Sequence, residues 1–311
     1  MAVIVNKIAV MFIMMAIGFL LGKLKIITGE GNKTLSAISL FLVSPLLSFS
    51  SYQREYSSHI AKNLALTLLL TVILYAVQIL AVFFLVPKKR KNSEIERMSL
   101  IFSNCGYIGI PLVQSVFGND GIIFLTMNIA VFYVLTWTLG VSLMTGKVSV
   151  KQTAKNLCTP AIFAVILGLI CFFANITLPS IILEPIESIG NMNTPLAMLI
   201  AGSTLAGTNL VKCFGNVRIY ILSALRLLVL PAICAAILLL ATYLGADSVV
   251  VTIVLIAMSC PSAVITTMFS HRFGGNSVYA SEIFALTTVL SAGTIPLVMW
   301  IFSLVGGSAV I

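Results

Sequence analysis

Long runs of apolar residues, rarely interrupted by charge, dominate this sequence. Charged residues make up 9% of the 311-residue chain, whereas an ordinary soluble domain carries about 25%. So few charges cannot cover the surface of a soluble protein of this size. Each run approaches the roughly 20 apolar residues that a membrane-spanning helix needs. We therefore predict an all-α polytopic membrane protein and exclude a soluble enzyme, a disordered chain and a small secreted disulfide domain.

About ten runs are long enough to cross a bilayer. They cover residues 5–24, 35–51, 60–86, 98–117, 121–144, 160–176, 192–206, 219–244, 249–269 and 278–305. Most lysines and arginines lie in the loops that follow the odd-numbered runs, including Lys88 to Lys91. Basic loops face the cytoplasm, so we expect a cell-membrane protein with both termini outside. The net charge of +9 then belongs to these loops, and we expect no nucleic-acid partner.

The chain divides into two sets of five runs with related features. Pro45 and Pro195 lie in the second and seventh runs, and Cys105 and Cys260 lie in the fourth and ninth. We predict a first five-helix repeat over residues 1–144, a short cytoplasmic linker over 145–157 and a second repeat over 158–311. Together they would form one integrated membrane domain. Because each half has an odd number of spans, the second copy is inverted, as is common in secondary transporters.

The fourth run contains residues that favour an interrupted helix. Pro111 lacks an N–H group and clashes with the preceding turn, which frees carbonyls near Tyr107. Gly106 and Gly109 lower the cost of unwinding there, and Asn104 adds an amide that can donate and accept hydrogen bonds. Taken alone, these residues also fit a proline kink in which Asn104 bonds a neighbouring helix.

The ninth run repeats this pattern with Ser259, Pro261 and Ser262. Two proline-broken spans in matching halves are more specific than one, and we expect them to cross at mid-depth. The N-termini of the half-helices would attract an anion such as a carboxylate, and the unwound carbonyls would attract a cation. We therefore predict a small substrate-binding site at the crossing.

Two further polar residues lie inside apolar runs, and each allows two interpretations. Arg226 is either an electrostatic anchor for an anionic substrate or a structural arginine that caps freed carbonyls or extends toward the basic face. Asn128 is either a substrate contact or an interhelical hydrogen-bond partner. No acidic residue is evident at mid-span, where proton and sodium carriers often hold a carboxylate. The sequence therefore leaves the coupling ion, proton or sodium, open.

At these motifs the chain resembles the auxin efflux carrier family, which includes the plant PIN-formed carriers and shorter bacterial permeases. The fourth-run Asn104 and the sequence 109–112 (GIPL) are similar to the most specific motif of the family. Residues 45–49 (PLLSF), which include Ser48, look like a second-helix stretch of the plant proteins. Arg226 with Pro231 is similar to an eighth-helix pair. Asn128 falls where the plant carriers have a glutamine.

The resemblance implies a ten-helix, 5+5 inverted-repeat carrier similar to bile-acid/sodium symporters. Helices four and nine would cross as broken helices, and helices one, two, six and seven would form a scaffold. Substrates in the family are organic anions, namely auxin in plants and dicarboxylates such as malate or malonate in bacteria. The chain departs from the plant pattern at Thr266, where the plant carriers have a proline, and in its short loop 145–157.

We therefore expect a secondary active transporter of small organic anions that works by alternating access. Its partners would be the anion and the lipid bilayer, with no cofactor or metal, and a homodimer is left open. One alternative is an intramembrane enzyme, but His59, His271, Asp120 and Asp247 are not placed at mid-span to form a catalytic pair. The other is a channel, although nothing resembles a filter motif. Saturable flux that responds to counter-transport would separate a carrier from a channel.

Overall fold

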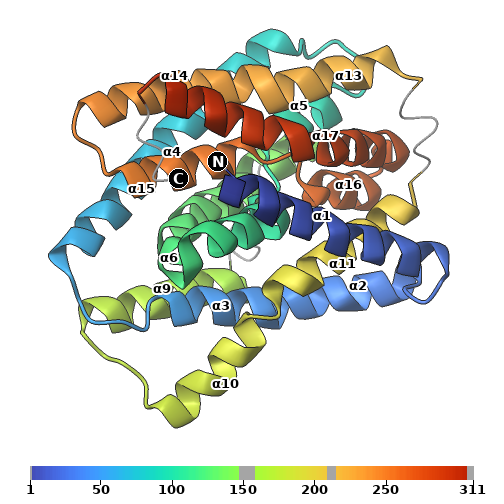
Figure 1. Cartoon of the computed structure of the whole chain (residues 1–311). Coiled ribbons are helices and arrows are strands. Elements are labelled where there is room, and N and C mark those ends of the chain that lie inside the picture. The colour runs from blue at the N-terminus through green and yellow to red at the C-terminus, as the bar shows by residue number, and fades with distance from the viewer. Residues whose placement is uncertain (1, 147–157, 209–214, 307–311) are drawn as a thin grey trace.

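The computed structural model describes residues 2–146, 158–208 and 215–306, and within them the named elements of secondary structure are all helices (Figure 1). The predicted linker lysines Lys147, Lys151 and Lys155, together with Lys212 and Cys213, lie outside the described residues. Six helical runs are long and apolar enough to cross a membrane, and two further apolar helices are shorter. The prediction of an all-α polytopic membrane protein is therefore confirmed.

Residues 2–146 contain seven α-helices. They are α1 (Ala2–Lys23), α2 (Gly29–Ile38), α3 (Ser44–Ser51), α4 (Ser58–Leu85), α5 (Ser93–Ile101), α6 (Ile110–Leu135) and α7 (Val141–Thr145). Helix α6 is kinked at Gly118, whose φ of 65° and ψ of −161° leave the helical region. A positive φ carries little steric cost for glycine because it has no Cβ. The kink falls between the fourth and fifth predicted spans.

The second half contains α9 (Pro160–Phe173), α10 (Ser180–Gly190), α11 (Asn193–Ala206), α13 (Val217–Ala224), α14 (Leu230–Tyr243), α15 (Ser248–Ser259), α16 (Val264–Arg272) and α17 (Ser277–Leu304). The short helices α9 and α15 are the two further apolar ones. Figure 1 shows α10 extending away from the bundle at its edge.

Wide π-helical turns precede three prolines. The turns are η1 (Ser39–Val43), η2 (Cys105–Gly109) and η4 (Leu225–Val229), and a fourth, η3 (Thr136–Gly140), joins α6 to α7. Pro45, Pro111 and Pro231 each occupy the second position of the α-helix that follows such a turn. A proline ring clashes with the carbonyl four residues earlier, and a widened turn moves that carbonyl away. Wide turns of this kind are frequent at functional sites.

The helices pack as two groups. In the scaffold group, α1 lies along α11, α2 also contacts α11, and α3 packs against α9. The main group contains α4, α5, α6 and α13 to α17, with α15 against α6 and α16 against α17. The two groups meet where α1 and α3 contact α6 and where α11 contacts η2.

Glycines permit the close packing of α1 on α11. A Cβ added to Gly18 would lie 2.6 Å from the carbonyl oxygen of Leu199, and one added to Gly202 would overlap the carbonyl oxygen of Met15. Small residues at helix interfaces let two backbones approach closely within a membrane, where burial of apolar surface supplies no driving force. These two glycines therefore fix the spacing of the scaffold group.

Two groups of polar contacts join segments near the helix ends. The buried Glu96 accepts hydrogen bonds from Arg218, at 2.6 and 3.0 Å, and from Tyr279 at 3.0 Å. These residues lie at the starts of α5, α13 and α17, which follow odd-numbered runs. Arg54 pairs with Asp120 at 3.0 Å, and both follow even-numbered runs. Each group therefore joins segments that follow runs of the same parity.

Candidate functional site

Two interrupted helices meet inside the bundle. Helix α5 ends at Ile101, and the chain runs through residues 102–104 before the η2 turn begins. Helix α15 ends at Ser259, and the chain is extended before α16 begins at Val264. The two unwound stretches lie antiparallel, with Ser103 opposite Ser262.

Backbone hydrogen bonds join the two stretches. The amide of Asn104 donates to the carbonyl of Pro261 at 2.8 Å, and the amide of Ala263 donates to the carbonyl of Phe102 at 2.9 Å. Unpaired peptide groups are very costly inside a bilayer, so each interruption supplies the partners that the other needs. The ninth-span interruption falls at Pro261, whereas the fourth-span interruption lies just before Gly106. The turn around Tyr107 is widened but not broken.

Side chains form hydrogen bonds with backbone groups on the side of the crossing where α5 and α15 end. The hydroxyl of Ser262 donates to the carbonyl of Ser99 at 2.8 Å, and the hydroxyl of Thr287 accepts from the amide of Ser262 at 3.3 Å. The Arg226 side chain is fully buried and donates to the carbonyls of Leu100, Met258 and Cys260. Of the two interpretations of Arg226, the carbonyl-capping one matches this geometry.

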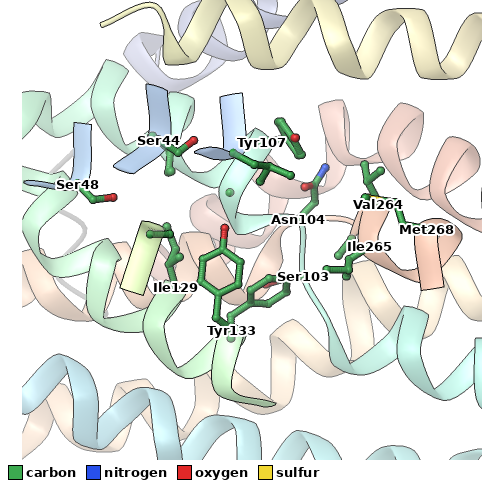
Figure 2. A pocket seen from close by; sticks show the side chains of 16 residues that line it. Ser44, Ser48, Ser103, Asn104, Tyr107, Ile129, Tyr133, Val264, Ile265 and Met268 are labelled. Carbon is green, nitrogen blue, oxygen red and sulfur yellow. The ribbon is translucent and has the colours of Figure 1, made fainter. Parts of the chain in front are cut away.

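A small cavity of about 70 Å³ lies on the opposite side of the crossing, where η2 and α16 begin. Its polar lining includes Ser44, Ser48, Ser103, Asn104, Tyr107 and Tyr133. Apolar side chains complete it, from Leu40, Ile110, Ile129, Phe132, Ala161, Ala263, Val264, Ile265 and Met268, with Gly106 between them. Figure 2 shows the Tyr133 hydroxyl pointing toward the space between Ser44 and Asn104.

No cationic side chain lines this cavity, but two helix N-termini adjoin it. The η2 turn begins immediately after Asn104, and α16 begins immediately after Ala263. The first amides of a helix have no intrahelical partner, and each helix N-terminus carries about half a positive charge. Asn104 is 3% exposed, and its side-chain Nδ2 atom has no hydrogen-bond partner among the described residues. The cavity thus offers donors for an anion.

Three of the predicted site residues line the cavity, namely Ser48, Asn104 and Gly106. The other six lie outside it, and these are Gly109, Pro111, Asn128, Ser259, Pro261 and Ser262. Pro261 and Ser262 build the crossing. Ser259 is the last residue of α15 and is buried.

The remaining three lie within the η2 turn and α6. Gly109 packs beneath Cys260, because a Cβ there would lie 3.4 Å from the Cys260 Sγ. Pro111 is buried and directly follows the wide η2 turn, which contains the cavity residues Gly106 and Tyr107. Asn128 is fully buried, and its Nδ2 donates to the Thr71 hydroxyl of α4 at 3.3 Å. The interhelical interpretation of Asn128 matches this contact.

Sequence reasoning missed much of the cavity wall. Tyr133 lies on α6, one turn after Ile129, and nothing in its local sequence distinguishes it from an ordinary apolar-face tyrosine. Ser44 directly precedes Pro45, and this neighbouring proline was the one feature of the sequence that could have indicated Ser44. The buried Glu96 was missed too, because it precedes the apolar part of the fourth span.

These features define a polytopic membrane protein with a small, partly polar cavity beside two interrupted helices, an arrangement suited to transport. The family described as membrane transport protein matches residues 3–156 and 143–299, which together include most of the chain. The chain therefore belongs to this family of membrane transporters, the auxin efflux carrier family. No curated protein matches the sequence.

Proposed function

We propose that this protein is a secondary active carrier of small organic anions, with the anionic group held in the cavity beside Asn104. The observation that carries the proposal is the position of the Asn104 amide. Its Nδ2 is buried, unpartnered among the described residues and placed at the start of η2, opposite the start of α16. Because unpaired buried donors are costly, a ligand acceptor is the natural partner for this group.

The partial charges of the two helix N-termini favour the binding of one carboxylate in the cavity. Two helix N-termini together present about one positive charge, which a single carboxylate would balance. Half-helix N-termini address anionic substrate groups in other transporters with discontinuous helices. The apolar wall, from Ile129 and Phe132 to Met268, would contact the organic part of the substrate.

The architecture we propose is the ten-span, 5+5 inverted repeat. The run Cys105–Thr145 has 41 residues, about twice what one crossing requires, and its kink at Gly118 would divide it into two spans. The basic loops would face the cytoplasm, with both termini outside the cell membrane. Residues 1–144 and 158–311 would then carry one repeat each.

The way in which the two packing groups share the cavity supports alternating access. Ser44 and Ser48 come from the scaffold group, whereas Asn104 and Tyr133 come from the main group. Movement of one group against the other would open the cavity to either side. At the proposed outer end, Gln114 of α6 donates to Asn191 at 3.1 Å and accepts from Thr194 at 3.0 Å, which bridges the groups there.

Uptake of labelled mono- and dicarboxylates into proteoliposomes tests this proposal. We expect saturable flux for at least one carboxylate, accelerated by the same anion on the opposite side. Asn104→Asp keeps the side-chain shape but replaces the donor with an acceptor, and it should reduce that flux at least about tenfold. Asn6→Ala, which alters an exposed asparagine on α1, is the control. Flux of no carboxylate in either direction would refute the proposal, and non-saturable flux would favour a channel.

A further inference from the structure

The C-terminal ends of two broken helices converge on one arginine. The Arg226 guanidinium lies 2.7 Å from the carbonyl oxygen of Leu100, near the end of α5. Its nitrogen atoms also lie 2.9 and 3.1 Å from the carbonyl oxygen of Cys260 and 3.2 Å from the carbonyl oxygen of Met258, at the end of α15. The last carbonyls of a helix have no intrahelical partner. A single side chain therefore pairs with carbonyls at both helix ends.

The charges at this point balance without any carboxylate. Each helix C-terminus carries about half a negative charge, so two ends present about one, which equals the charge of a guanidinium. Within residues 2–146, 158–208 and 215–306, the ion pairs are those of Arg54, His59, Arg90 and Arg218. Arg226 is fully buried and takes its compensation from the helix ends.

Unwound carbonyls and half-helix C-termini are the groups that coordinate a sodium ion in transporters with broken helices. We propose that Arg226 is a built-in cation that occupies this position permanently. Transport by this protein then needs no sodium ion at the crossing, because the carbonyls that would bind one are already paired and their charge is already neutralised. This inference rests on the proposed function and extends it to the coupling ion, but the first test of the inference requires no substrate.

The first test measures melting temperature in sodium chloride and in choline chloride at equal ionic strength. Wild-type protein should melt at the same temperature in both salts. Arg226→Ala removes the donor from the carbonyls of Met258 and Cys260 and should melt about 10 °C lower in choline. Sodium or low millimolar guanidinium chloride should raise the melting temperature of this variant, because either cation can enter the vacated position.

Two control variants separate a built-in cation from an ordinary hydrogen-bond donor. Gln78 donates to the same Leu100 carbonyl at 2.8 Å but carries no charge, so Gln78→Ala should show no response to sodium or guanidinium. Arg226→Lys keeps the charge and should be insensitive to sodium. An Arg226→Ala variant that no cation stabilises would overturn the proposal, as would wild-type protein that sodium stabilises.

Transport gives a second, independent readout on wild-type protein, which remains informative if Arg226→Ala does not fold. Flux of a transported carboxylate in sodium medium divided by flux in choline medium should be about 1, since the crossing already holds its cation. A ratio of about 10 or more would contradict the proposal. Failure of all carboxylate flux would refute the proposed function, whereas the melting experiment would still decide the role of Arg226.

Discussion

The backbone amide of Asn104 lies 2.8 Å from the carbonyl oxygen of Pro261, although the two residues belong to different halves of the chain. This contact holds two interruptions together, and it sets their helix N-termini on one side and their C-termini on the other. The N-terminal side contains the cavity, and the C-terminal side contains Arg226. One crossing therefore separates a region suited to an anion from a region already occupied by a cation.

Pro111→Ala tests whether the wide η2 turn matters for transport. Without the proline ring, the turn around Tyr107 can tighten to an ordinary α-helical turn, which moves Gly106 and Tyr107 in the cavity wall. We expect carboxylate flux to fall severalfold while the melting temperature stays unchanged or rises. Pro185→Ala, in the exposed helix α10, should leave flux unchanged. Normal flux in Pro111→Ala would show that the turn can tighten without harm.

Gly202→Ala tests the close contact between α1 and α11. The new methyl group would overlap the carbonyl of Met15, so the helices must separate, at a cost of about 3 kcal/mol. The free energy of unfolding, measured by denaturant titration in detergent micelles, should fall accordingly. At Gly207 an added Cβ would lie 3.5 Å from the Thr204 carbonyl, an ordinary contact, and Gly207→Ala should cost under about 1 kcal/mol. Equal effects at both positions would contradict this account of the scaffold group.

The Asn128–Thr71 hydrogen bond predicts a small coupling energy. Interhelical hydrogen bonds in membranes average about 0.6 kcal/mol in double-mutant cycles. The cycle of Asn128→Ala and Thr71→Ala should give a coupling of that size in the free energy of unfolding. The KM for the transported anion should change less than about twofold, since Asn128 does not line the cavity. A large KM increase in Asn128→Ala would favour substrate contact instead.

Asp247 caps α15, the helix that leads into the crossing. Its carboxylate accepts from the amides of Val249 and Val250 and from Asn63. Burial alone would raise the pKa of Asp247, but these hydrogen bonds, together with the nearby His59, outweigh it and hold the pKa below the ordinary value. The stabilisation is therefore present above the ordinary pKa of about 3.9 and is lost as the pH falls through the folded-state pKa.

Asp247→Ala should accordingly lower the free energy of unfolding by about 1 kcal/mol at neutral pH. Asp247→Ser retains a capping oxygen and should lose less. The difference between wild type and Asp247→Ala should shrink when the melting temperature is measured at acidic pH. A difference that is independent of pH would show that the carboxylate charge contributes nothing.

The sequence predicted the membrane class and the location of the crossing for identifiable physical reasons. Long apolar runs have few alternatives to membrane helices, and a proline such as Pro261 inside one must interrupt its hydrogen bonds. The kink at Gly118 was foreseen as a boundary because the apolar pattern stops there.

The rest of the site could not be predicted, because it depends on which helix faces meet. Tyr133 and Ser44 lie on different packing groups, and only the assembled bundle brings them together around the cavity. The pairing of Arg226 with carbonyls from α5 and α15 is also long-range, so the sequence allowed two interpretations. The wide turn at Tyr107 replaced an expected break, since an enlarged turn relieves the proline clash while keeping most hydrogen bonds.

The most direct test of the central claim is an experimental structure with a brominated carboxylate bound, located by the anomalous scattering of bromine. We predict that the carboxylate lies within hydrogen-bond distance of the Asn104 Nδ2, with the bromine-bearing part against Ile129 and Met268. A ligand bound beside Arg226, or away from both helix N-termini, would contradict the account.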